Sequence, residues 1–159
     1  MAVSTVSSSS LQGWQLIATN ATTTGASSVF SGLSGYKKFL IVWTGITTAT
    51  NTYFVLTLNA TASGYVGGAV TAGTNGYNSN TTYMALSGVA SSTRNGYLYV
   101  DNPLETAPKV FTGGGDSSSI AETYNGALSI ATAVSSIELK FSGGQSFTGG
   151  SISLYGIPA

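Results

Sequence analysis

The chain has 159 residues with five basic and five acidic side chains, so its formal net charge is zero. Charged residues make up 6% of the sequence, against about 25% in ordinary soluble domains, so small polar residues must cover most of the surface. Five scattered cations cannot form the basic face that nucleic acid binding requires. The absence of His and Cys excludes histidine-dependent triads, Cys–His pairs and ordinary zinc sites. We therefore expect one domain that uses no metal, no cofactor and no nucleic acid.

The first twelve residues are small and mostly polar, and they are interpreted as a flexible or docking N-terminal arm before a domain at 13–159. Val3, Thr5 and Val6 alternate weakly, which would allow this arm to add a strand to a neighbouring protein. The start of the chain has neither the basic nor the apolar region of a signal peptide. No run approaches the roughly 20 apolar residues of a membrane span. We expect synthesis in a host cytoplasm and no insertion into a membrane.

The first half of the chain contains several short apolar runs typical of strands. Residues 36–43 include the continuous apolar run 39–43, which predicts a strand buried on both faces or one at a corner of a sandwich. The next run alternates, with Phe54, Leu56 and Leu58 predicted to point inward. The predicted strands of this half are residues 14–18, 28–30, 36–43 and 53–59.

The second half begins with residues 60–80, which are rich in Gly, Ala, Thr and Asn and predict a long loop with at most short strands. Asn95-Gly96 is a strong signal for a hairpin turn. The last two runs, 136–141 and 151–157, alternate cleanly across a Gly-rich connection. The predicted strands of this half are residues 82–86, 97–100, 109–111, 127–131, 136–141 and 151–157.

Short strands separated by turns every eight to twelve residues or so, without a convincing amphipathic helix, indicate an all-β fold. We predict a single β-sandwich with jelly-roll-like topology. The strand patterns place Trp43, Phe39, Phe54 and Phe141 in the core.

Few kinds of catalysis or metal binding remain possible for a chain without His and Cys. Two carboxylates suffice for glycoside hydrolysis, but only residue type supports that reading, and we expect a protein that is not an enzyme. Asp101, Glu105 or Asp116 could ligate calcium, although the spacing matches no calcium loop, and capped turns are the favoured interpretation. The acidic residues are Asp101, Glu105, Asp116, Glu122 and Glu138.

Nine tyrosines offer amphipathic rings that can contact sugars or proteins. Tyr65, Tyr77 and Tyr83 lie in or beside the predicted long loop. We interpret them as candidate ligand or partner contacts, with the alternative that their rings pin the loop onto the sandwich.

Three stretches of the sequence resemble a known family. Phe30, a Gly-containing turn, Tyr36 and the apolar run to Val42 form the first, residues 54–59 the second, and residues 150–157 with the Gly-rich loop before them the third. Together they resemble small β-sandwich domains of tailed-bacteriophage virion proteins, often found at the ends of tail fibres. Longer members of that family carry a shaft or anchoring region, whereas about a dozen residues precede the domain here, which favours direct attachment to a capsid or tail.

The resemblance implies a non-enzymatic structural protein on the surface of a tailed-phage virion, contacting other virion proteins. It would be a host-facing fibre or receptor-binding module that recognises a host surface glycan or protein; a capsid decoration (cement) protein on the head is the alternative. A homo-oligomer is expected in both cases, with a trimer as our prediction. A stand-alone carbohydrate-binding module is the further alternative.

Overall fold

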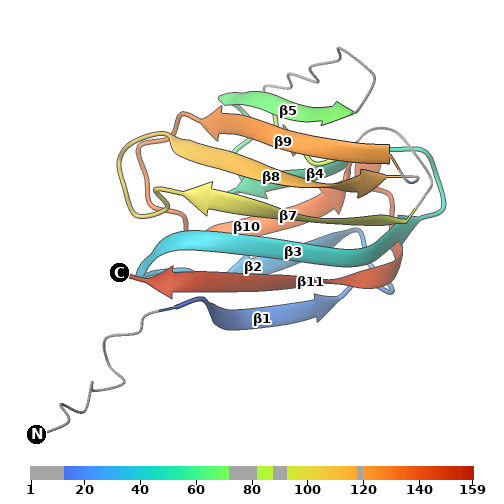
Figure 1. The fold of residues 1–159 in the computed structure, drawn as a ribbon, viewed down its shortest axis with the longest axis horizontal. Coiled ribbons are helices and arrows are strands. Elements are labelled where there is room, and N and C mark those ends of the chain that lie inside the picture. Colours follow the sequence, from blue (N-terminus) through green and yellow to red (C-terminus); the bar gives the residue numbers. More distant parts are fainter. Residues whose placement is uncertain (1–12, 72–81, 88–92, 118–119) are drawn as a thin grey trace, which may run out of the picture.

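The computed structural model describes residues 13–71, 82–87, 93–117 and 120–159. Two antiparallel β-sheets pack face to face as one β-sandwich (Figure 1). In the described part of the chain the single helical element is a short 3-10 turn, Ser142–Gly144. The prediction of an all-β sandwich is confirmed, whereas the jelly-roll topology stays a prediction.

The larger sheet has seven strands in the order β1-β11-β3-β7-β8-β9-β5. Figure 1 shows them stacked from β1 at the bottom to β5 at the top. Every neighbouring pair is antiparallel. The strands are β1 (Gln15–Ala21), β3 (Tyr36–Thr48), β5 (Tyr65–Thr71), β7 (Arg94–Asp101), β8 (Lys109–Ser117), β9 (Ile120–Leu128) and β11 (Phe147–Pro158).

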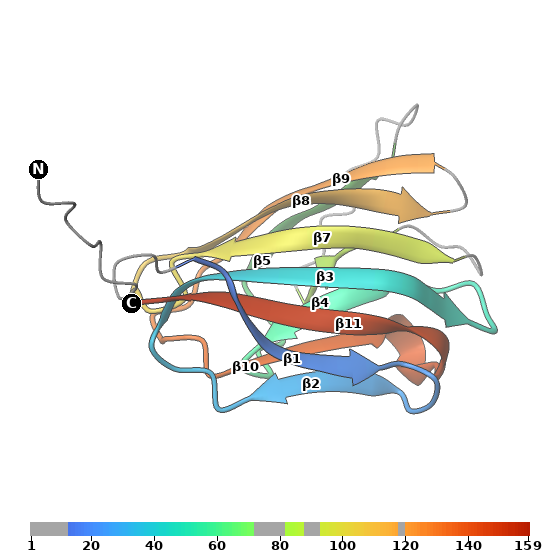
Figure 2. The same ribbon diagram turned by 60° about the horizontal axis from the view of Figure 1, so that its bottom comes forward.

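The smaller sheet has four strands in the order β2-β10-β4-β6 and lies behind the larger one in Figure 1, whereas in the turned view of Figure 2 its strand β2 appears below β1. Its strands are β2 (Ser27–Ser31), β4 (Phe54–Leu58), β6 (Met84–Ala85) and β10 (Ser136–Phe141). Consecutive strands often belong to different sheets: β1 and β2 are one such pair, and β10 and β11 another. The chain therefore passes repeatedly from one layer to the other.

The core between the sheets is built from the inward residues of both layers and is aromatic at its centre. The ring centroid of Trp43 lies 5.6 Å from that of Phe54 and 5.6 Å from that of Tyr124. Phe141 lies 5.6 Å from Phe54 and 5.1 Å from Phe147. Such tilted and edge-on pairs add to the stabilisation that burial of the rings supplies. The predicted core positions Phe39, Trp43, Phe54 and Phe141 are all buried.

Strand β3 differs from its prediction because only one of its two faces is buried. Ile41 and Trp43 are buried, but Leu40 and Val42 point to the other side and are only half-buried. The strand is therefore neither covered on both faces nor at a corner. Its continuous apolar run arises because the outward face of this sheet is itself apolar.

Three glycine-containing segments that predicted loops or turns are strands in the structure. β5 occupies part of the predicted 60–80 loop, β8 includes the three glycines of 113–115, and Asn95-Gly96 lies inside β7. At several of these glycines neighbouring atoms leave no room for a side chain. A Cβ on Gly96 would lie 2.6 Å from Trp43 Cζ2, and one on Gly113 would lie 2.2 Å from the carbonyl oxygen of Tyr97. The strand predicted at 127–131 lies earlier in the chain, because β9 spans Ile120–Leu128.

Candidate functional site

The face of the seven-stranded sheet that points away from the four-stranded sheet is exposed and largely apolar; we call it the outer face. Cross-strand pairing aligns its side chains in rows, of which one runs from Leu16 through Tyr155 and Leu40 to Tyr99. Leu16 is 57% exposed. Most of the charge on the outer face belongs to a single ion pair between Lys38 and Asp101. The outward residues of the central strands are Lys38, Leu40, Val42, Tyr97, Tyr99, Asp101, Ser153, Tyr155 and Ile157.

Three aromatic rings gather on this face, and we call Trp14, Tyr97 and Tyr99 the aromatic platform. The ring of Tyr99 lies 5.7 Å from that of Trp14 and 5.7 Å from that of Tyr97. Tyr97 is 45% exposed and Trp14 is 38% exposed. Exposed aromatic rings in contact with one another offer rigid, amphipathic contact area at a low cost in side-chain entropy.

The cation beside the platform is held in place from two sides. Lys38 Nζ lies 2.8 Å from Asp101 Oδ1 and 5.1 Å from the centroid of the Tyr99 ring. The carboxylate neutralises the ammonium group, and the ring adds a cation–π contact. The platform is therefore bordered by charge that is already compensated.

An open depression of about 450 Å³ lies against Tyr97 and Tyr99. Leu40, Val42 and Thr44 line it from β3. Asn95 lines it from β7, and its amide is oriented because Oδ1 accepts a hydrogen bond of 2.8 Å from the backbone N–H of Gly45. The open depression thus places apolar side chains beside a fixed amide and a hydroxyl group.

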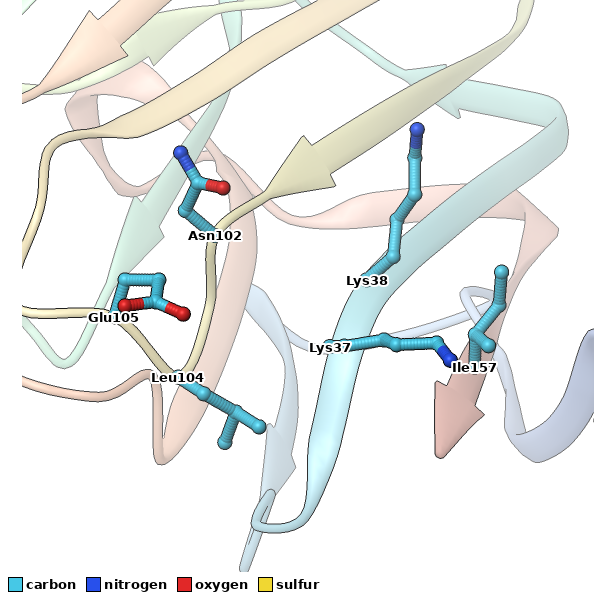
Figure 3. Close-up of a pocket in the computed structure, with 6 residues that line it drawn as sticks. All are labelled: Lys37, Lys38, Asn102, Leu104, Glu105 and Ile157. Atoms are coloured by element: carbon cyan, nitrogen blue, oxygen red, sulfur yellow. The ribbon is translucent and has the colours of Figure 1, made fainter. Parts of the chain in front are cut away.

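A second depression, of about 360 Å³, lies at the end of the sandwich where β7 and β11 end (Figure 3). Lys37 extends beside Ile157, while Lys38 points away from Lys37, and Leu104 and Glu105 enter from the loop between β7 and β8. The depression contains one carboxyl group, so it does not assemble the pair that glycoside hydrolysis needs.

A buried polar cluster lies at the other end of β7. Arg94 Nε donates to Ser87 Oγ at 2.6 Å and Nη2 donates to the carbonyl oxygen of Thr52 at 3.0 Å. Burial lowers the pKa of the Arg94 guanidinium, and the charge of Glu122 opposes that shift. Tyr124 Oη donates to Glu122 Oε2 at 3.3 Å, and burial together with this carboxylate raises the pKa of Tyr124 above its usual range. The two Arg94 hydrogen bonds connect β7 to the segments just before β4 and just after β6, so the buried guanidinium has polar partners within the fold.

The other acidic residues are dispersed. Glu138 Oε2 lies 2.6 Å from Lys140 Nζ. Burial by itself would raise the pKa of Glu138, but Lys140 and hydrogen bonds from Thr57 and Ser27 hold it below its usual value. In the described part of the chain no group of three acids could hold a metal ion.

Of the three tyrosines predicted as contacts, the structure describes Tyr65 and Tyr83. Tyr65 is 1% exposed and belongs to β5, where its ring stacks on Phe111 with centroids 6.3 Å apart, so the prediction of a contact at Tyr65 is wrong. Tyr83 is half-buried just before β6 and is not on the outer face. Tyr77 lies outside the described residues, as do Val3, Thr5 and Val6 of the predicted arm.

The aromatic platform was missed although the sequence carries two signals for it. In Tyr97-Leu98-Tyr99 the two rings alternate with a buried leucine, so they share one face of a strand. The doubly apolar run of β3 pairs with that strand. Together these patterns predict an apolar, aromatic surface.

Comparisons with family models, with curated proteins and with solved structures found no match to the chain. No helix among the described residues is long and apolar enough to cross a membrane. The resemblance to phage virion domains therefore stays a prediction.

Proposed function

We propose that this protein is a non-enzymatic structural protein on the surface of a tailed-phage virion, and that it acts there as a host-facing fibre or receptor-binding module. The observation that carries the proposal is the exposed, aromatic outer face of the seven-stranded sheet. Large apolar patches on soluble proteins mark binding surfaces. The proposal includes a homo-oligomer, with three copies as its expected number.

Capsid decoration is the alternative within this class. The whole chain has only ten charged residues in 159, so its surface gains little solubility from charge repulsion, which suits a protein held in a larger assembly. In a decoration protein the outer face would rest on the head, whereas in a receptor-binding module it would point away from the particle.

Electron microscopy of intact particles tests the proposal. Gold-labelled antibody against the purified protein should mark the particle, on tail fibres for a receptor-binding module and over the head for a decoration protein. Particles that carry no label, in a preparation where a known virion protein is labelled, would contradict the proposal in both forms.

A stand-alone carbohydrate-binding module is the second candidate function. The observation that favours it is the depression beside Tyr97 and Tyr99, where apolar walls meet an oriented amide. This candidate requires ligand binding by the isolated protein and no association with particles.

A further inference from the structure

The ring of Tyr97 lies over Gly114 of the neighbouring strand β8. Its partner across the strands is Gly114, and a Cβ at that position would lie 3.7 Å from Tyr97 Oη. A larger side chain there would displace the ring. Because Gly114 has none, the phenol ring can lie across β8, and Tyr97 remains 45% exposed to solvent.

Polar groups surround the platform at several positions. Thr44 lies on β3, and Asn95 Nδ2 donates to Asp116 Oδ2 at 3.5 Å, which uses one of the two amide hydrogens. Thr112 pairs with Tyr99, and Asn125 pairs with Thr112; both are exposed. Hydroxyl and amide groups both donate and accept hydrogen bonds, so they match ligands that carry many hydroxyl groups.

The charge of the platform selects among such ligands. The ammonium group of Lys38 is paired with Asp101 at 2.8 Å, so it offers little uncompensated charge to a carboxylate or sulfate. An anionic ligand would have to displace Asp101 and would meet the carboxylate of Asp116, which accepts a hydrogen bond from Asn95. An uncharged ligand requires no such displacement and meets no such repulsion.

We propose that the aromatic platform and the depression beside it bind a neutral oligosaccharide. A pyranose ring has an apolar C–H face that packs on an aromatic ring and a rim of hydroxyl groups that form hydrogen bonds. Tyr97 and Tyr99 supply the rings, and Asn95 and Thr44 supply polar partners in a depression of about 450 Å³. This inference deepens the proposed function, since it names the ligand class of the same face.

Binding by the isolated full-length protein tests the inference. The probes are neutral oligosaccharides built from glucose, galactose, mannose or N-acetylglucosamine, compared with sialylated and sulfated ones on an array and then by calorimetry. At least one neutral probe should bind at about 1 mM, where a site with a Kd of about 1 mM is half occupied. Acidic probes should bind no more tightly than their neutral counterparts. If no neutral probe binds, or if only acidic ones do, the inference is wrong.

Matched variants separate stacking from other effects. Tyr97→Ala should weaken binding by about tenfold, as truncation of a central aromatic contact does. Tyr97→Phe keeps the ring and should retain most of the affinity. Val66→Ala alters an exposed residue on the far edge strand β5 and should leave the affinity unchanged. Unchanged affinity in Tyr97→Ala would place the ligand elsewhere and overturn the inference.

Two further readouts identify other occupants of the platform. Sedimentation should give the same oligomeric state for the original protein and Tyr97→Ala; dissociation of the variant would make the platform a subunit interface and overturn the inference. Particle labelling is independent of these measurements. Labelled particles without glycan binding would contradict only the inference of a neutral oligosaccharide ligand. Glycan binding without labelled particles would contradict only the virion proposal.

Discussion

The phenol oxygen of Tyr65 accepts a hydrogen bond from the backbone N–H of Leu58, with 2.7 Å between oxygen and nitrogen, and so joins the two sheets. Strand β6 pairs only with Val55 and Leu56, so Leu58 lies beyond the end of that pairing. The tyrosine hydroxyl supplies the partner that this buried N–H requires.

Tyr65→Phe should therefore destabilise the protein by about 1–3 kcal/mol, the cost of leaving a buried donor unsatisfied. Tyr155→Phe is the matched control, because Tyr155 is half-exposed on the outer face. Urea unfolding at neutral pH measures both. Equal stability of the two variants would show that the Leu58 N–H is satisfied in another way.

Alkaline pH should destabilise the fold through the same residue. Burial raises the pKa of Tyr65 from 10.0 to about 12, although the Leu58 hydrogen bond lowers it in part. The unfolded chain loses the phenol proton near pH 10, whereas the folded chain holds it up to about pH 12. The stabilisation is complete below pH 10 and is lost as the pH rises toward 12.

Urea midpoints between pH 8 and pH 12 measure this loss, and Tyr65→Phe should show a smaller decrease than the original protein. Tyr124 contributes in the same direction, because its pKa is also raised. Identical alkaline decreases with and without the Tyr65 hydroxyl would contradict the linkage.

Leu154→Ala tests the register of β11. Leu154 is buried against Ile41, while the next residue, Tyr155, points outward. Truncating a buried leucine costs about 2–5 kcal/mol, and Tyr155→Ser should cost clearly less. A larger loss for Tyr155→Ser would mean that the strand is shifted by one residue.

Gly96→Ala tests the close packing of β7 on Trp43. The added Cβ would lie 2.6 Å from Trp43 Cζ2 and 2.8 Å from the carbonyl oxygen of Gly114. We expect a loss of about 1–3 kcal/mol, as for other overpacked cores. Gly13→Ala is the control, since no heavy atom lies within 4 Å of its added Cβ. Thermal melting compares them; no loss at position 96 would mean that the Trp43 ring can move aside.

The parts of the fold that could be predicted from sequence are those in which apolar and polar residues alternate. The pattern of residues 136–141 gave β10 with its inward residues assigned correctly. β5 escaped prediction, and β8 was predicted only over residues 109–111, because Gly67, Gly68 and the glycines of 113–115 remove that pattern where strands approach closely. A Cβ on Gly67, for example, would lie 2.2 Å from the carbonyl oxygen of Asn125. The same composition is typical of turns, so local sequence cannot separate the two cases.

The site was less predictable because exposure of a tyrosine depends on which face its strand buries. Tyr65 and Tyr97 are both strand residues, yet Tyr65 is buried and Tyr97 is exposed. Their difference arises from cross-strand pairing: Tyr65 pairs with the buried Leu128, and Tyr97 pairs with Val42 on the outer face. That pairing involves distant parts of the chain, which single-strand patterns do not specify.

The pairing of β10 and β11 has a consequence for how the chain is made. β10 pairs with β2 and β4, while β11 pairs with β1 and β3. Thr19, in β1, meets Ser153 across 134 residues. While residues 136–158 are still inside the ribosome, β1 and β2 have none of their pairing partners. Contacts of such long sequence separation slow folding, so the emerging chain must keep uncharged strands soluble until synthesis of these residues is complete. We expect the two sheets to close after that point, with the first two strands joining late.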